Sequence, residues 1–260
     1  MSHKRASHVL YSTVRAMVRR YRGKVQTWIV CNEVTDPEGK RGLRTDVPWY
    51  NTIGPGYVAE AFHQAHDEDP HALLLLNEFG FDTVNQYGDK PVPRQKATLE
   101  VLDHLLKHNV PVHGLGIEAH LIATDYAQRF HAREFRHFLH EVASRGLKIV
   151  ITEMDVLDDG LPPAIKPRDR GVADVYRRFL DTALQEPEVI AVIQYGLSDR
   201  WTEENDDNPR PDGVSRRPCP FDANFKPKPA YYAIRNALEG APRRHPYWVP
   251  PKARHHHHHH

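Results

Sequence analysis

Two glutamates, Glu33 and Glu153, each follow closely on a short apolar segment of the chain. A carboxylate in such a place is costly unless a site requires it, because burying an unpaired charge is strongly unfavourable. Two carboxyl groups can cleave the acetal bond between sugars when one, protonated, assists the leaving oxygen and the other, ionised, attacks the anomeric carbon. The pair therefore indicates the acid/base, Glu33, and the nucleophile, Glu153, of a retaining glycoside hydrolase.

Polar side chains also follow the other apolar segments. Asn32 adjoins Glu33 and offers an amide that can bind a sugar hydroxyl. Asp155 lies two residues after Glu153, so in an extended chain it points to the same side, and His120 could then bridge these two carboxylates. A single glutamate at a strand end is at least as often a loop residue or a helix N-cap. Polar residues, however, follow all five apolar segments, and this favours a functional site over five unrelated loop residues. The polar groups are Asn32-Glu33, Asn77-Glu78, Glu118-Ala119-His120, Thr152-Glu153-Met154-Asp155 and Ser198-Asp199-Arg200-Trp201.

The apolar segments alternate with longer amphipathic stretches, which is typical of consecutive βα units and of a parallel sheet. Because the segments are almost continuously apolar, we expect strands that are covered on both faces. The predicted strands are residues 25–31, 72–76, 110–117, 147–151 and 189–195. In open α/β sheets and in (β/α)8 barrels the active site lies at the carboxyl ends of the strands, where these polar groups collect.

Helices are predicted between the strands from apolar residues that recur with a period of 3.6. A first helix over residues 6–20 is expected to face inward with Leu10, Val14, Met17 and Tyr21. Gly146, directly before a strand, predicts a helix stop. Two further helices present apolar faces made of Phe135, Phe138, Leu139 and Val142, and of Val172, Val175, Tyr176, Phe179, Leu180 and Leu184.

Composition excludes several classes of protein. The net charge of +1 is spread over both signs, so nothing suggests nucleic acid or a membrane surface as a partner. No apolar run reaches the roughly 20 residues of a membrane span, no targeting peptide is recognisable, and no glycine-rich nucleotide loop follows the first strand. Cys31 and Cys219 fit neither a disulfide framework nor a metal-binding pattern. The length of 260 residues predicts one α/β domain over residues 1–254, followed by a histidine tag at 255–260.

The motifs resemble those of glycoside hydrolase family 10, the retaining endo-β-1,4-xylanases. WIVCNE at 28–33 is similar to the family's strand-four sequence, and ITEMD at 151–155 to its nucleophile motif. The resemblance covers residues 6–240 in family order and includes PWY at 48–50, HALLLLNE at 71–78, GLGIEAHL at 114–121, GLSDR at 196–200 and PFDANFKPKPAYY at 220–232. It implies a (β/α)8 TIM-barrel fold, xylan or xylo-oligosaccharides as substrate, no metal or organic cofactor, and a secreted or periplasmic protein.

The resemblance also implies roles for individual residues. Glu33 matches the family's acid/base and Glu153 its nucleophile, while Asn32 matches the sugar-binding amide. His120 and Asp155 match the pair around the nucleophile. The remaining candidates for substrate binding are Asn77, Glu118, His120, Tyr195 and Trp201.

Three positions depart from the family pattern. Glu118 stands where the family has glutamine, and a third carboxylate beside Glu153 would raise one of the pKa values. Tyr195 and Glu203 stand where the family usually has tryptophan, so the aromatic floor under the sugar is expected to be thinner. Trp201 is either a compensating aromatic or a partly exposed loop residue.

By the same resemblance, the chain begins before strand four of the barrel and lacks strands one to three. Five strands cannot close an eight-stranded barrel, so the strands at 25–31 and 189–195 are expected to be open edges that self-associate. Weak activity on xylan is expected, and two alternatives stay open. One is a weakened barrel piece that binds xylan or assembles with itself, and the other is a β-1,4-glucanase.

Overall fold

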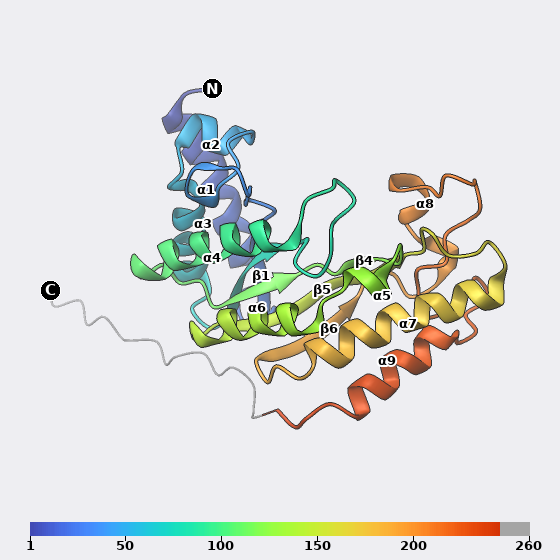
Figure 1. Ribbon diagram of the computed structural model, residues 1–260. Helices are drawn as coiled ribbons and strands as arrows, with labels where there is room; N and C mark the ends of the chain where they lie inside the picture. Colours follow the sequence, from blue (N-terminus) through green and yellow to red (C-terminus); the bar gives the residue numbers. More distant parts are fainter. Residues whose placement is uncertain (245–260) are drawn as a thin grey trace, which may run out of the picture. The chain divides into compact units, whose positions relative to one another are not determined.

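The computed structural model describes residues 1–244, so the predicted tag at 255–260 lies outside the described residues. The chain divides into two compact units, and Figure 1 shows their helices and strands. Among the described residues, one unit comprises Met1–Glu78 and Lys96–Leu115, and the other comprises Phe79–Gln95 and residues 116–244. Helix α4 and strand β3 cross the boundary between the units along the sequence.

The first unit contains two parallel strands with helices before and between them. Strands β1 and β2 pair so that Thr27 lies opposite Leu73 and Asn32 opposite Asn77. This register brings the polar carboxyl ends of the two strands together. Helix α1 packs against α3. The elements are α1 (His3–Arg20), β1 (Thr27–Asn32), η1 (Lys40–Gly42), α2 (Pro48–Ile53), α3 (Tyr57–Glu68), β2 (Leu73–Glu78) and most of α4 (Pro91–Lys107).

The second unit is built around one long strand, β5, which pairs in parallel with both β4 and β6. Helix α7 packs against α6 and lies alongside α9 (Figure 1). The predicted apolar faces of α6 and α7 are buried, as expected. The elements are β3 (Gly114–Ile117), β4 (His120–Ile122), α5 (Tyr126–Arg129), α6 (Ala132–Ser144), β5 (Lys148–Leu157), α7 (Ile165–Ala183), β6 (Val189–Gln194), η2 (Asp199–Trp201), α8 (Glu204–Asp207) and α9 (Pro229–Glu239).

All five predicted strands are present, but one boundary was wrong and one short strand was missed, and both differences matter for the site. Strand β5 continues to Leu157, past the predicted end at residue 151, because the short strand β4 pairs with its last residues. Glu153 and Asp155 therefore lie within a strand and not after it. Strand β4 was not predicted, since three residues carry too little pattern to recognise.

The expectation that every strand is covered on both faces was also wrong. Strand β2 is buried throughout, whereas β1 and β6 alternate between covered and exposed residues. Ile29 is 44% exposed and Ile193 is 51% exposed. Within its unit, each of these strands pairs with a single neighbouring strand, β1 with β2 and β6 with β5.

The inward face of the first helix was predicted only in part. Met17 is 50% exposed and Tyr21 is 38% exposed, whereas Ala6 and Val18 are buried. Ala6 and Val18 are the only buried residues of α1, which packs against α2 and α3. Gly146 follows the end of α6 with a φ of +77°, which agrees with the predicted helix stop.

Two predictions from composition can be compared with the described residues. Cys31 and Cys219 are both buried and free. No helix within residues 1–244 is both long enough and apolar enough to cross a bilayer.

Candidate active site

Glu153 on β5 is held by a histidine on the neighbouring strand. The β4–β5 register sets His120 opposite Asp155. Nδ1 of His120 lies 2.6 Å from Oδ1 of Asp155, and Nε2 lies 3.1 Å from Oε1 of Glu153. The bridge that the sequence suggested between Asp155 and Glu153 is therefore present in the structure.

His120 carries a positive charge in this arrangement. Burial by itself lowers the pKa of His120, but the hydrogen bonds with Asp155 and Glu153 outweigh it and raise that pKa to about 11. Both ring nitrogens are then protonated and donate to carboxylates. Since Glu153 faces a cation, its ionised form is favoured, which is the form that a nucleophile requires.

Glu118, the departure from the family pattern, lies beside this trio. It is buried, and its Oε1 is 4.0 Å from Nε2 of His120. Its backbone carbonyl accepts the N–H of Glu153 at 2.9 Å, which ties the two chain segments together. Ala119, the next residue, has a φ of +63°, and this left-handed kink separates β3 from β4.

Two sets of these side chains come close enough to raise the question of a metal ion. The first set is Glu118, His120 and Glu153, and the second set is His120, Asp155 and Glu204. Each set needs a lone pair on His120, and a histidine that donates from both nitrogens has none to offer. The arrangement therefore suits an ion-paired catalytic carboxylate better than a metal centre.

Replacing Glu118 with glutamine is expected to move the acid limb of the pH–activity profile to lower pH, by about half a unit to one unit. The negative charge of Glu118 favours the protonated form of Glu153, so its removal lets Glu153 ionise in more acidic solution. The measurement is kcat/KM against pH, with Glu134→Gln on α6 as a matched control at an exposed position. An unchanged acid limb would mean that the two carboxylates do not interact.

Glu33 follows β1 and is fixed through its backbone. It has a φ of +56°, a left-handed conformation that costs a non-glycine residue about 1 kcal/mol or more. Its N–H donates to the carbonyl of Asn77 at 2.9 Å, and its carbonyl accepts from Nη1 of Arg44 at 3.1 Å. Strain that is held by two contacts in this way is typical of functional residues.

The residues next to Glu33 form a supporting network. Nδ2 of Asn77 donates to Oδ1 of Asn32 at 2.9 Å, and Nδ2 of Asn32 lies 3.5 Å from Oε2 of Glu33. Glu78 is fully buried and accepts hydrogen bonds from the N–H and the hydroxyl of Thr35, at 2.9 and 2.6 Å. Asn77 is also fully buried and orients Asn32 through its Nδ2 hydrogen bond, and its role in substrate binding stays a prediction.

The two positions that lack the family's tryptophan are occupied by residues that pair with each other. The hydroxyl of Tyr195 donates to Oε2 of Glu203 at 2.6 Å, which raises the pKa of that tyrosine. The Tyr195 ring meets the His120 ring edge to face, with centroids 4.9 Å apart. Tyr195 thus packs against the residue that holds Glu153.

Trp201 does not join this group in the structure. Its ring is 69% exposed and contacts Phe225, with centroids 5.5 Å apart, and the guanidinium of Arg200. Trp201 is the last residue of η2, and its role as a compensating aromatic in substrate binding stays a prediction. Sequence reasoning missed Glu204 and Arg44, because neither belongs to an apolar period or to a recognisable motif.

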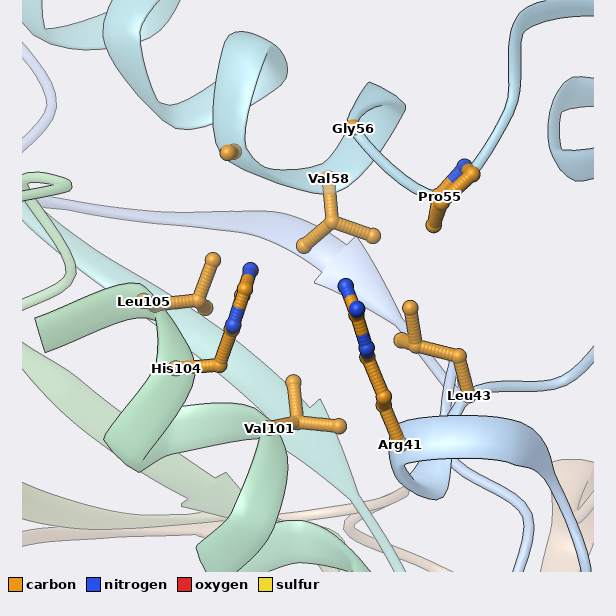
Figure 2. A pocket seen from close by; sticks show the side chains of 9 residues that line it. Arg41, Leu43, Pro55, Gly56, Val58, Val101, His104 and Leu105 are labelled. Carbon is orange, nitrogen blue, oxygen red and sulfur yellow. The ribbon is translucent and has the colours of Figure 1, made fainter. Parts of the chain in front are cut away.

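A separate pocket of about 230 Å³ lies within the first unit and contains none of the predicted site residues. Figure 2 shows Arg41 and His104 pointing into it between apolar side chains. Burial lowers the pKa of His104, and the neighbouring His108, Arg41 and Lys107 act in the same direction. The pocket is lined by residues in or beside η1, at the start of α3 and in the second half of α4. They are Arg41, Leu43, Pro55, Gly56, Val58, Ala59, Val101, His104 and Leu105.

Comparison with known proteins agrees with the resemblance seen in the sequence. The family described as Glycosyl hydrolase family 10 matches residues 1–237. Endo-1,4-beta-xylanase B of Thermotoga neapolitana is 30% identical over 237 residues, which cover 89% of this chain and 62% of that enzyme. The chain therefore spans less than two thirds of the length of this relative.

Solved xylanase structures are similar to this chain in fold. Native xylanase 10B from Thermotoga maritima matches with a TM-score of 0.79 and 29% identity, over 92% of this chain and 68% of that one. Xylanase 10B from Thermotoga petrophila, solved in complex with xylobiose, also gives 0.79, with 28% identity over 92% of this chain and 67% of that one. These matches confirm the predicted α/β fold of the TIM-barrel type.

Proposed function

Because the chain belongs to glycosyl hydrolase family 10, we propose that it is an endo-β-1,4-xylanase that cleaves xylan by a retaining double displacement. The observation that carries the proposal is the charged bridge from Asp155 through His120 to Glu153. It keeps one carboxylate ionised and oriented, as a nucleophile must be. Glu33 is the second carboxyl group that the reaction needs.

In the first step a carboxylate oxygen of Glu153 attacks the anomeric carbon, while Glu33 gives its proton to the leaving glycosidic oxygen. In the second step Glu33 takes a proton from water, and this water displaces Glu153 from the sugar. His120 holds Glu153 through Oε1, at 3.1 Å from Nε2.

Xylo-oligosaccharides are the proposed ligands, since the Thermotoga petrophila relative was solved with xylobiose. The five predicted strands, observed as β1, β2, β3, β5 and β6, are proposed to correspond to strands four to eight of the family's barrel, with both units in one catalytic domain. The chain covers 68% of the Thermotoga maritima structure, which is compatible with that correspondence.

A second candidate function is xylan binding with little hydrolysis. The paired Tyr195 and Glu203 favour it, because they replace two aromatic rings that would stack on the sugar. Release of reducing sugar from xylan separates the candidates, with Glu153→Gln as the blank. Binding of xylohexaose without release of sugar would support the second candidate and contradict the first.

Self-association through strands β1 and β6 is the expected state of the purified chain. Apolar side chains on these strands are exposed, and within residues 1–244 each strand pairs with a single neighbouring strand of its unit, which is the situation in which edge strands associate. Light scattering is expected to show species larger than a monomer. Ile29→Lys and Ile193→Lys should shift the population toward monomer, because a charged edge strand resists pairing.

The matched control is Ile165→Lys, which changes an isoleucine that is 56% exposed at the start of α7 and lies on no strand. It should leave the distribution as it is. A monodisperse monomer for the unmodified chain, at concentrations up to those used for activity, would contradict the proposal that these edges associate.

A further inference from the structure

Asp155 has one carboxylate oxygen that the bridge to His120 leaves unused. Asp155 is fully buried, and its Oδ1 accepts from His120 at 2.6 Å. Its Oδ2 is buried too and has no hydrogen-bond partner within residues 1–244. A buried acceptor without a donor is unfavourable, so this oxygen points to a partner that supplies a proton.

Glu204 is placed to be that partner. It is the first residue of α8 and is only 5% exposed. An oxygen of its carboxyl group, an oxygen of Asp155 and a ring nitrogen of His120 all lie within 4.8 Å of one another. Nδ2 of Asn208 donates to Oε2 of Glu204 at 3.3 Å. One water molecule can span two oxygens at such a separation, and a small rotation would allow direct contact.

We propose that Glu204 is a positioning residue for the hydrolysis proposed above: as a carboxylic acid it donates a hydrogen bond to Oδ2 of Asp155, directly or through one water. This bond satisfies the buried oxygen and fixes the carboxylate of Asp155. Asp155 then holds the imidazolium of His120 at the distance that orients Glu153. The inference rests on the proposed function for its catalytic consequence, but the hydrogen bond itself does not.

The surroundings of Glu204 favour the protonated form in mildly acidic solution. Burial raises the pKa of Glu204 to about 7, and the negative charge of Asp155 acts in the same direction. His120, Asn208 and Arg216 oppose this rise. The titratable and charged groups around it are therefore Asp155 on β5, His120 on β4, and Arg216 and Cys219 in the segment after α8.

Linkage gives a test that does not depend on activity. The ordinary pKa of glutamate is 4.5, so between about pH 4.5 and 7 the folded chain keeps a proton that the unfolded chain releases. Glu204 therefore makes the free energy of unfolding fall as pH rises through this window. Glu204→Gln removes this component, because glutamine donates a hydrogen bond but does not titrate. Asp206→Asn, at an exposed position on the same helix, is the matched control.

Urea unfolding at several pH values is the measurement. The difference in midpoint between Glu204→Gln and the unmodified chain should grow from pH 5 to pH 8, whereas Asp206→Asn should show no such trend. A constant difference would overturn the proposal. A proton NMR signal of the His120 ring provides a second readout: it should persist in Glu204→Gln and broaden in Glu204→Leu, and an identical signal in all three proteins would also overturn it.

The pH dependence of kcat/KM on a xylo-oligosaccharide completes the experiment. Activity of the unmodified chain should decline near pH 7 as Glu204 ionises, and Glu204→Gln should extend activity to higher pH. Glu204→Leu should lower kcat/KM about tenfold or more, the size of effect known for outer partners of histidine ligands. If no protein in the series hydrolyses xylan, the proposed function fails, while the unfolding and NMR results still decide the role of Glu204.

Discussion

Glu153→Gln is expected to lower kcat on xylan by at least about four orders of magnitude, the scale seen when a covalent nucleophile is removed. The amide of glutamine cannot form the glycosyl ester, so the first displacement has no acceptor for the sugar. Its carbonyl oxygen can still accept the Nε2–H of His120 at the position of Oε1. The side chain should therefore stay in place, and the loss should be chemical.

Two measurements establish this. Initial rates of reducing-sugar release are compared with those of Glu134→Gln, which alters an exposed glutamate on α6 and should retain full activity. Affinity for xylotriose, measured by calorimetry, should stay within a few-fold of that of the unmodified chain. A Glu153→Gln protein that keeps more than a small fraction of the rate would assign the nucleophile to another residue, for which Glu118 is the nearest carboxylate in the same cluster.

Sequence patterns predicted the second unit well because its helices bury wide apolar stripes. Phe135, Phe138 and Leu139 recur with the helical period and are all buried. Met17 and Tyr21 have the same period on α1 but remain exposed, because periodicity shows which residues share a face and not how much of that face is covered. Coverage depends on tertiary neighbours, and α1 has contacts chiefly with α2 and α3.

The nucleophile side of the site could be predicted because its spacing is local. Glu153 and Asp155 alternate along one strand, and a single cross-strand neighbour, His120, joins them. Glu204 could not be predicted, since its position beside Asp155 depends on a turn of helix far along the chain. Likewise, the pairing of Tyr195 with Glu203 is visible only once the loop after β6 has folded.

Glu33→Gln is expected to slow hydrolysis strongly on xylan but to spare the first displacement on a substrate with a good leaving group. On xylan the rate should fall by about two to four orders of magnitude, because the leaving sugar oxygen no longer receives a proton. On an aryl xylobioside with an acidic phenol as leaving group, the first displacement needs no such proton and should proceed at nearly the original rate. A rapid burst of phenol followed by slow turnover is then expected, since the second displacement still lacks its base.

The backbone contacts of Glu33 should be the same in Glu33→Gln and in the unmodified chain, so the difference in rate should reflect the carboxyl group alone. Its N–H bond to Asn77 and its carbonyl bond from Arg44 do not involve the carboxyl group, so glutamine should keep the left-handed conformation and the fold. Azide supplies a further check, because it can attack the glycosyl-enzyme without any proton transfer and should restore turnover of the aryl substrate. Equal losses on both kinds of substrate, with no effect of azide, would show that Glu33 is not the acid/base and that its strained position serves another purpose.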